Sequence, residues 1–273
     1  MRRLFVNADD FGLTEGITRG IAVAMATGVV GGTTAMVCAA GAPERISRYG
    51  REFAGRIGLH LQLTGATPPC LPPGDVPSLV GADGLFPRKK LDVADVSPDE
   101  VRREWRAQLA RFRETGLEPS HLDSHHHIHK RPEVFPVFLE LARDLGVPAR
   151  ALSADMRRAM DAAGVPHADD CLTRFYGEDI GEATLLSLVD EAFATLGGAG
   201  VLEVMAHPGH DDAALRVIST YAAGRARELR VLTSPELARQ LAAREIAVVG
   251  PSQAAQVSDL SHAGGYPRPS ATS

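Results

Sequence analysis

Histidine and aspartate are concentrated in a few short segments of this sequence. Residues 121–129 read HLDSHHHIH, so that five of the ten histidines fall within nine positions. Asp9 and Asp10 lie in NADDFG, His60 ends the motif GLH, and His207 lies in AHPG. Imidazoles and carboxylates together bind zinc and other first-row divalent ions, and they are also the usual general acids and bases. The pattern therefore predicts a metal-dependent active site.

Asp9 and Asp10 are adjacent carboxylates at the end of a predicted buried strand, RLFVNAD. Burying two like charges is costly unless a cation neutralises them. Because neighbouring residues of a regular strand point to opposite faces, the two carboxylates are expected to have different roles. One would bind a metal while the other reaches a water molecule. A turn followed by a helix cap explains a single Asp pair equally well.

The histidine-rich segment predicts one ligand and several supporting residues. Strand alternation places alternate residues on one side, namely His121, Asp123, His125, His127 and His129. The strand must end near Ser124 or His125, because a helix follows from about Pro132. His125 is therefore the best candidate for a metal ligand, and Asp123, His127 and His129 are expected to line the site or orient ligands. His126 is expected to pack. A satisfied polar cluster without a metal is the alternative.

His60 lies in an otherwise apolar strand, where a single histidine is more often a hydrogen-bonded core residue than a ligand. With Asp10 and His125 it makes a mixed nitrogen and oxygen ligand set for one divalent ion, which suits zinc better than magnesium. Three protein ligands leave positions for water, as in catalytic sites.

His207 precedes a proline and a glycine that turn the chain. There it can donate a proton to a leaving group, although a loop or helix-cap histidine is the alternative. The neighbouring His210, Asp211 and Asp212 are expected to be solvated loop residues.

Size and composition predict one globular domain. The chain has 273 residues, of which 44% are hydrophobic and 23% charged. A net charge of −5 argues against nucleic-acid binding. The sequence contains no apolar run long enough for a membrane span and no signal-like N-terminus, so we expect a cytoplasmic protein.

Cys38, Cys70 and Cys171 are widely spaced, which predicts reduced thiols without a disulfide framework or thiolate zinc site.

Predicted strands alternate with predicted helices, which indicates a parallel sheet covered by helices. The strands are 3–9, 33–40, 56–63, 121–125, 200–207 and 246–250, with weaker ones at 149–153 and 172–175. The helices are 15–27, 42–53, 97–116, 132–145, 181–198 and 234–245. Polar residues at the ends of several strands favour an irregular (β/α) TIM-like barrel over an open sheet, and no GxGxxG occurs. We expect a barrel domain over 1–250 and a flexible tail over 251–273.

Several motifs in one order resemble the YdjC-like family of carbohydrate deacetylases, which includes the chitooligosaccharide deacetylases. They span residues 2–245 and comprise NADDFG, GLHLQLTG, PSHLDSHHHIH, FYGEDI, LEVMAHPG and ELRVLTSPEL. The resemblance implies an irregular (β/α) barrel, one divalent metal ion, a homodimer, and removal of acetyl groups from small N-acetylated sugars. The alanine before HPG stands where a cysteine is common in the chitooligosaccharide enzymes. The proline-rich loop 66–87 is distinctive and is expected to shape substrate access, and residues 251–273 extend beyond the matched part.

The resemblance also implies roles for individual residues. Asp10, His60 and His125 match the metal ligands, Asp9 the general base and His207 the general acid. Magnesium is the ion usually associated with the family, whereas the ligands themselves favour zinc. In this mechanism Asp9 takes a proton from the attacking water, and His207, as an imidazolium, protonates the departing sugar amine. The alternatives are a barrel phosphoesterase or amidohydrolase with two or more metals, and a non-catalytic sugar- or metal-binding module.

Overall fold

The computed structural model describes residues 1–93, 95–219 and 221–255. Its strands form one parallel sheet in the order β4-β3-β2-β1-β6-β5, and β7 pairs with β1 as well. The strands are β1 (Arg2–Phe11), β2 (Gly32–Ala35), β3 (Ile57–Leu61), β4 (Leu122–Ser124), β5 (Asp170–Leu172), β6 (Gly200–Ala206) and β7 (Ile246–Val248). Strands β4 and β5 are the two edges of this sheet. The prediction of an irregular single-domain barrel is confirmed, in the form of a curled half-barrel.

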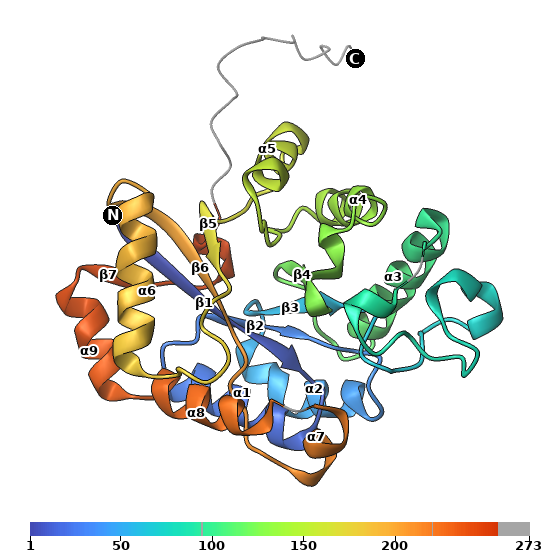
Figure 1. The fold of residues 1–273 in the computed structure, drawn as a ribbon, viewed down its shortest axis with the longest axis horizontal. Coiled ribbons are helices and arrows are strands. Elements are labelled where there is room, and N and C mark those ends of the chain that lie inside the picture. Colours follow the sequence, from blue (N-terminus) through green and yellow to red (C-terminus); the bar gives the residue numbers. More distant parts are fainter. Residues whose placement is uncertain (94, 220, 256–273) are drawn as a thin grey trace, which may run out of the picture.

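Helices surround the curled sheet, as Figure 1 shows. They are α1 (Glu15–Thr27), α2 (Ala42–Gly50), α3 (Pro98–Arg113), α4 (Phe135–Leu145), α5 (Ala154–Ala163), α6 (Glu182–Thr195), α7 (Ala213–Ile218), α8 (Ala222–Leu232) and α9 (Pro235–Ala243). Among the described residues, no helix is both long and apolar enough to cross a membrane.

Strand β1 is the centre of the sheet. It pairs with β6 along residues 2–8, with β7 at residues 2–4, and with β2 from Asn7 onward. All its residues from Leu4 to Phe11 are buried, as expected for a parallel strand covered on both faces. The pairing with β2 becomes irregular between Ala8 and Phe11, which is where the two aspartates lie. This irregularity changes where their side chains point.

Strong helix-start signals gave accurate predictions. Helix α1 has the bounds predicted for it, and α3 and α9 each begin with a serine cap followed by proline. The predicted strand 149–153 is wrong, because only an isolated bridge joins Leu122 to Ala149. Helices α5, α7 and α8 were not predicted. Helix α8 buries Arg225 and Glu228, and these charged residues interrupt the apolar periodicity that identifies a helix.

The proline-rich segment 64–97 packs against the domain through Val76, Leu79 and Phe86, which are buried. Its described residues include short 3-10 turns at Pro73–Asp75, Pro77–Leu79 and Lys90–Asp92. The start of the predicted tail is packed too, since Pro251 and Ala254 are buried. The rest of that predicted tail, 256–273, lies outside the described residues.

Substitution of Gly31 is a test of the tight packing beside β1. Its amide donates to the carbonyl of Val6 at 3.0 Å, and an added Cβ would lie 2.1 Å from the carbonyl oxygen of Val249. We expect Gly31→Ala to lower the free energy of unfolding by about 1–3 kcal/mol, measured by urea denaturation, because backbone has to move. Gly74→Ala is the control, since its added Cβ meets nothing within 4 Å. Equal stability of the two variants would contradict this packing.

Candidate active site

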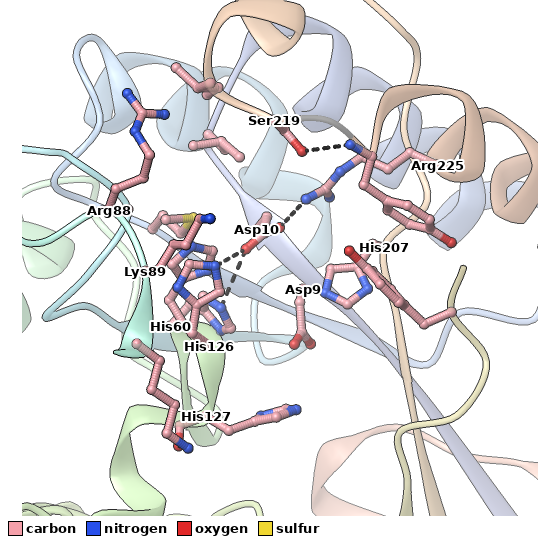
Figure 2. A pocket seen from close by; sticks show the side chains of 18 of the residues that line it. Asp9, Asp10, His60, Arg88, Lys89, His126, His127, His207, Ser219 and Arg225 are labelled. Carbon is pink, nitrogen blue, oxygen red and sulfur yellow. Dashed lines mark hydrogen bonds and ion pairs between the residues drawn. The ribbon is translucent and has the colours of Figure 1, made fainter. Parts of the chain in front are cut away.

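The carboxyl ends of β1, β3, β4 and β6 meet at a cavity of about 740 Å³. Six of the site residues predicted from the sequence line it: Asp9, Asp10, His60, His125, His127 and His207. Figure 2 shows Asp9, Asp10 and His207 facing the same space from β1 and the end of β6. The structure therefore brings residues from four distant segments into one site.

Asp10 has a backbone conformation that a regular strand does not allow. Its φ is +75°, so the alternation expected from the sequence fails and both aspartates line the cavity. Its Oδ1 lies 3.1 Å from His125 Nδ1 and 3.4 Å from His60 Nε2, while Arg225 Nη2 donates to Oδ2 at 2.5 Å. Burial acts to raise the pKa of Asp10, but Arg225 and His125 hold it well below its usual value. Asp10 is therefore ionised.

His60 is held by a second carboxylate. Its Nδ1 lies 2.6 Å from Asp123 Oδ1 and 3.1 Å from Thr34 Oγ1, which leaves Nε2 facing Asp10. Burial acts to lower the pKa of His60, but Asp123 above all raises it to about 10. A carboxylate behind a histidine that orients its free nitrogen is the usual support of a metal ligand. Asp123 thus contacts a proposed metal ligand, and its supporting role stays a prediction.

The donor atoms fit one divalent cation. The ligand atoms of Asp10, His60 and His125 all lie within 4.8 Å of one another. Two imidazole nitrogens and one carboxylate oxygen suit zinc or another first-row ion better than magnesium. Asp9, His60 and Asp123 form a second group at similar distances, but the Arg150 guanidinium already lies between its two carboxylates. The Arg150 guanidinium thus already neutralises the carboxylates of the second group, whereas Oδ1 of Asp10 faces two imidazoles.

Arg150 is a site residue that sequence reasoning missed. It is 2% exposed and donates from Nη1 and Nη2 to the two oxygens of Asp9, each at 2.7 Å. Nη1 also lies 2.9 Å from Asp123 Oδ2, and Nε donates to Glu203 Oε1 at 2.6 Å. Burial acts to raise the pKa of Asp9, but Arg150 brings it well below its usual value. The sequence offered one signal that could have identified it, because Arg150 is a single arginine in the otherwise apolar segment 147–152.

His207 lies at the end of β6 and is oriented through its backbone. Its amide donates to Glu228 Oε2 at 2.5 Å, and Tyr221 Oη donates to Glu228 Oε1 at 2.7 Å. The ring of Tyr176 meets the imidazole edge to face, with centroids 5.4 Å apart. Burial, followed by Arg225, lowers the pKa of His207 to about 4, so the ring is neutral near pH 7. Glu228 and the two tyrosines were not named from the sequence.

The histidine triplet turns sharply after β4. His126 and His127 both have a φ of +53°, which sends successive rings in different directions. His126 was expected to pack, but it lines the cavity. Its ring is tilted against that of His125 with centroids 3.9 Å apart, and its Nδ1 lies 3.0 Å from Thr64 Oγ1. His127 also lines the cavity, and its buried Nδ1 has no hydrogen-bond partner among the described residues.

Two other sequence expectations differ from the structure. His129 lies in the core, where it stacks on Phe138 at 4.4 Å and contacts Ser124 Oγ, and it does not line the cavity. Asp212 was expected to be a solvated loop residue. It caps α7 and accepts hydrogen bonds from Thr14 Oγ1 and the Gly16 amide, which ties α7 to α1.

Comparison with known proteins places the chain in a family. The model of the YdjC-like protein family matches residues 3–243. The chain is 34% identical to a carbohydrate deacetylase of Brevibacillus brevis over 90% of its length and 97% of the relative. It is 38% identical to a chitooligosaccharide deacetylase of Serratia marcescens over 88% and 94%. The crystal structure of a putative cellobiose-phosphate cleavage protein from Enterococcus faecalis, 34% identical, superimposes with a TM-score of 0.84 over 93% of this chain and 99% of the other. This protein therefore belongs to the YdjC-like family.

Proposed function

We propose that this protein is a metal-dependent carbohydrate deacetylase, which hydrolyses the acetamide of N-acetylated sugars to acetate and a free amino sugar. The relatives named as carbohydrate and chitooligosaccharide deacetylases support the activity. One observation carries the proposal in this chain. Asp9 and Asp10 face the same cavity, yet Asp10 contacts two imidazoles whereas Asp9 is paired with an arginine. These different surroundings support the proposal that Asp10 binds a metal and Asp9 transfers a proton.

Asp10, His60 and His125 would hold the divalent ion. When bound, such an ion polarises the acetamide carbonyl and lowers the pKa of a water molecule. The donor atoms favour zinc, and the family resemblance favours magnesium; our proposal is one divalent ion of either kind. The homodimer implied by that resemblance stays a prediction.

Asp9 would accept the proton of the attacking water. Its Oδ1 accepts from Asn7 Nδ2 and Arg150 Nη2, whereas Oδ2 accepts from Arg150 Nη1 alone among the described residues. Oδ2 therefore keeps an unused acceptor position, and Asp9 itself lines the cavity. Arg150 fixes the plane of the carboxylate and keeps it ionised, so that it is ready to act as a base near neutral pH.

His207 would protonate the sugar nitrogen, because an amine is a poor leaving group without a proton. The free ring is neutral near pH 7, so it would first take up a proton from solvent and then pass that proton to the nitrogen. Negative charge that develops on the acetamide oxygen raises the proton affinity of a nearby imidazole. The backbone bond to Glu228 and the edge of Tyr176 hold the ring in place for this transfer.

The alternative enzymes are less compatible with this site. A barrel phosphoesterase or amidohydrolase with two metals needs a second cation site, and Arg150 lies between the carboxylates that would form it. A non-catalytic binding module has no use for a buried base and a proton donor facing one cavity. Asp9 and His207, which line one cavity here, would fill these two roles.

The rim of the cavity suggests the class of sugar. Arg88 and Lys89, which are exposed, and the partly buried Lys90 line one side of it. Cations at a pocket entrance attract an anionic ligand. The name of the enterococcal relative refers to a phosphorylated disaccharide. We therefore include an N-acetylated sugar that carries a phosphate group among the proposed substrates.

Replacing the proposed base tests the division of roles. We expect Asp9→Asn to reduce acetate release from N-acetylated oligosaccharides by about 100-fold or more, because general base catalysis is lost. Its metal content, measured by elemental analysis after loading with zinc or magnesium, should remain near one ion per chain. Asp10→Asn is the matched control and should lose the ion as well. A metal-free Asp9→Asn protein would contradict the assignment.

Arg150 should control the pH range of activity. Without this cation, burial would raise the pKa of Asp9, so the carboxylate would be protonated at a higher pH. We expect the acidic limb of kcat/KM to move to higher pH in Arg150→Gln and to move less in Arg150→Lys. Arg157→Gln, which removes a partner of Asp170 outside the cavity lining, is the control. An unshifted limb in folded Arg150→Gln would be evidence against its role.

Replacing Arg88 and Lys89 at the rim tests the proposed class of substrate. We expect Arg88→Gln/Lys89→Gln to raise KM for a 6-phosphorylated N-acetylated disaccharide while KM for its neutral counterpart stays the same. The effect should fade at high salt, because exposed charges are screened. Lys130→Gln, which does not line the cavity, is the control. Equal effects on both substrates would exclude a phosphate contact at this rim.

A further inference from the structure

Two of the three cysteines are brought into contact outside the proposed active site. Cys38 Sγ and Cys70 Sγ lie 3.7 Å apart although 32 positions separate them in the chain. Cys38 follows β2 and is 2% exposed, whereas Cys70 lies in the proline-rich segment 64–97 and is partly exposed. The wide spacing of the cysteines in the sequence did not indicate that these two would be in contact.

Backbone hydrogen bonds anchor both cysteines where they are. The Cys38 amide donates to Gln62 Oε1 at 3.2 Å. The amides of Cys70 and Leu71 donate to the two oxygens of Glu104 at 2.9 and 3.0 Å. Because Gln62 lies beside β3 and Glu104 on α3, the two sulfurs face each other from separate parts of the framework. Their contact is therefore set by the fold.

The two thiols differ in reactivity. Hydrogen bonding with Cys38, followed by the Arg111 guanidinium, lowers the pKa of the Cys70 thiol. Arg111 Nη1 lies 3.8 Å from Cys70 Sγ. Burial raises the pKa of the Cys38 thiol. Cys70 is more exposed and more easily ionised than Cys38. In a thiol–disulfide exchange, Cys70 would therefore be the attacking thiol and Cys38 the resolving thiol.

A soft metal ion is the other ligand that two thiols could take, since Glu104 also lies within 4.8 Å of both sulfurs. However, Glu104 Oε1 already accepts from the Cys70 amide and Gln108 Nε2, and Oε2 accepts from the Leu71 amide. Arg111 adds a positive charge beside Cys70. A metal cation would have to displace these hydrogen-bond donors from Glu104 and approach the positive charge of Arg111. The surroundings of the two thiols therefore favour oxidation to a disulfide over metal binding.

We propose that Cys38 and Cys70 are a redox-active dithiol that closes to a reversible disulfide and ties the proline-rich segment to the end of β2. With a small disulfide such as oxidised glutathione, the Cys70 thiolate attacks one sulfur and displaces a glutathione thiolate. Cys38 then loses its proton and attacks Cys70 Sγ, which displaces the second glutathione. Two protein thiols are oxidised and one glutathione disulfide is reduced to two thiols. Closure to the bonded S–S distance of about 2.05 Å needs a small side-chain movement.

Thiol counting tests this proposal directly. After incubation of the full-length protein with oxidised glutathione, we expect the three thiols to fall to one, measured with a chromogenic disulfide after denaturation. Peptide mapping should link residue 38 to residue 70, and dithiothreitol should restore all three thiols. The disulfide constrains the unfolded chain, so we expect Tm to rise by roughly 5 °C.

Cysteine variants provide the matched controls. Cys171→Ser should form the same disulfide and show the same rise in Tm. Cys38→Ser should instead stop at a stable glutathione adduct on Cys70, because the resolving thiol is absent. Three free thiols after oxidation, or an adduct on Cys70 that persists in the unsubstituted protein, would overturn the proposal. So would a zinc ion that the protein binds in the absence of oxidant and loses in Cys38→Ser and Cys70→Ser but keeps in Cys171→Ser.

Discussion

The buried carboxylates of Asp9, Asp10 and Asp123 impose the constraint on which the site depends. Each is at most 2% exposed, and buried negative charges require partners of opposite charge and good geometry. The chain supplies Arg150 to Asp9 and Asp123, and Arg225 to Asp10. This choice of partners gives the two neighbouring aspartates different surroundings, because Asp9 is paired with Arg150 whereas Asp10 keeps one oxygen for two imidazoles.

The fold meets this constraint by making β1 irregular at one point. A regular strand would send Asp9 and Asp10 to opposite faces, and only one could reach the cavity. The positive φ of Asp10 and the shifted pairing with β2 bring both to the same side. A non-glycine residue in this conformation is costly, and it persists because the surrounding ion pairs and packing fix it.

Helix α8 links the two halves of the proposed chemistry. Arg225 and Glu228 are three residues apart and therefore lie on neighbouring positions of one helix face. Arg225 holds Asp10, and Glu228 holds the backbone of His207 and the hydroxyl of Tyr221. The proposed metal ligand and proton donor are thus positioned by a single rigid element. The Cys38–Cys70 pair lies where the proline-rich segment meets α3 and the chain that follows β2.

The sequence by itself determined the class of fold and most of the chemical groups. Alternating apolar strands and well-capped helices such as α1 and α3 are local signals, and Asp9, Asp10, His60, His125 and His207 stand out because such residues are rare at strand ends. Only the tertiary structure decided which groups meet. Arg150, Arg225 and Glu228 come from unremarkable segments, and their roles follow from charges that lie close in space but far apart in the chain. The direction of Asp10, the core position of His129 and the contact of Cys38 with Cys70 were also decided by long-range packing, which no local pattern of residues encodes.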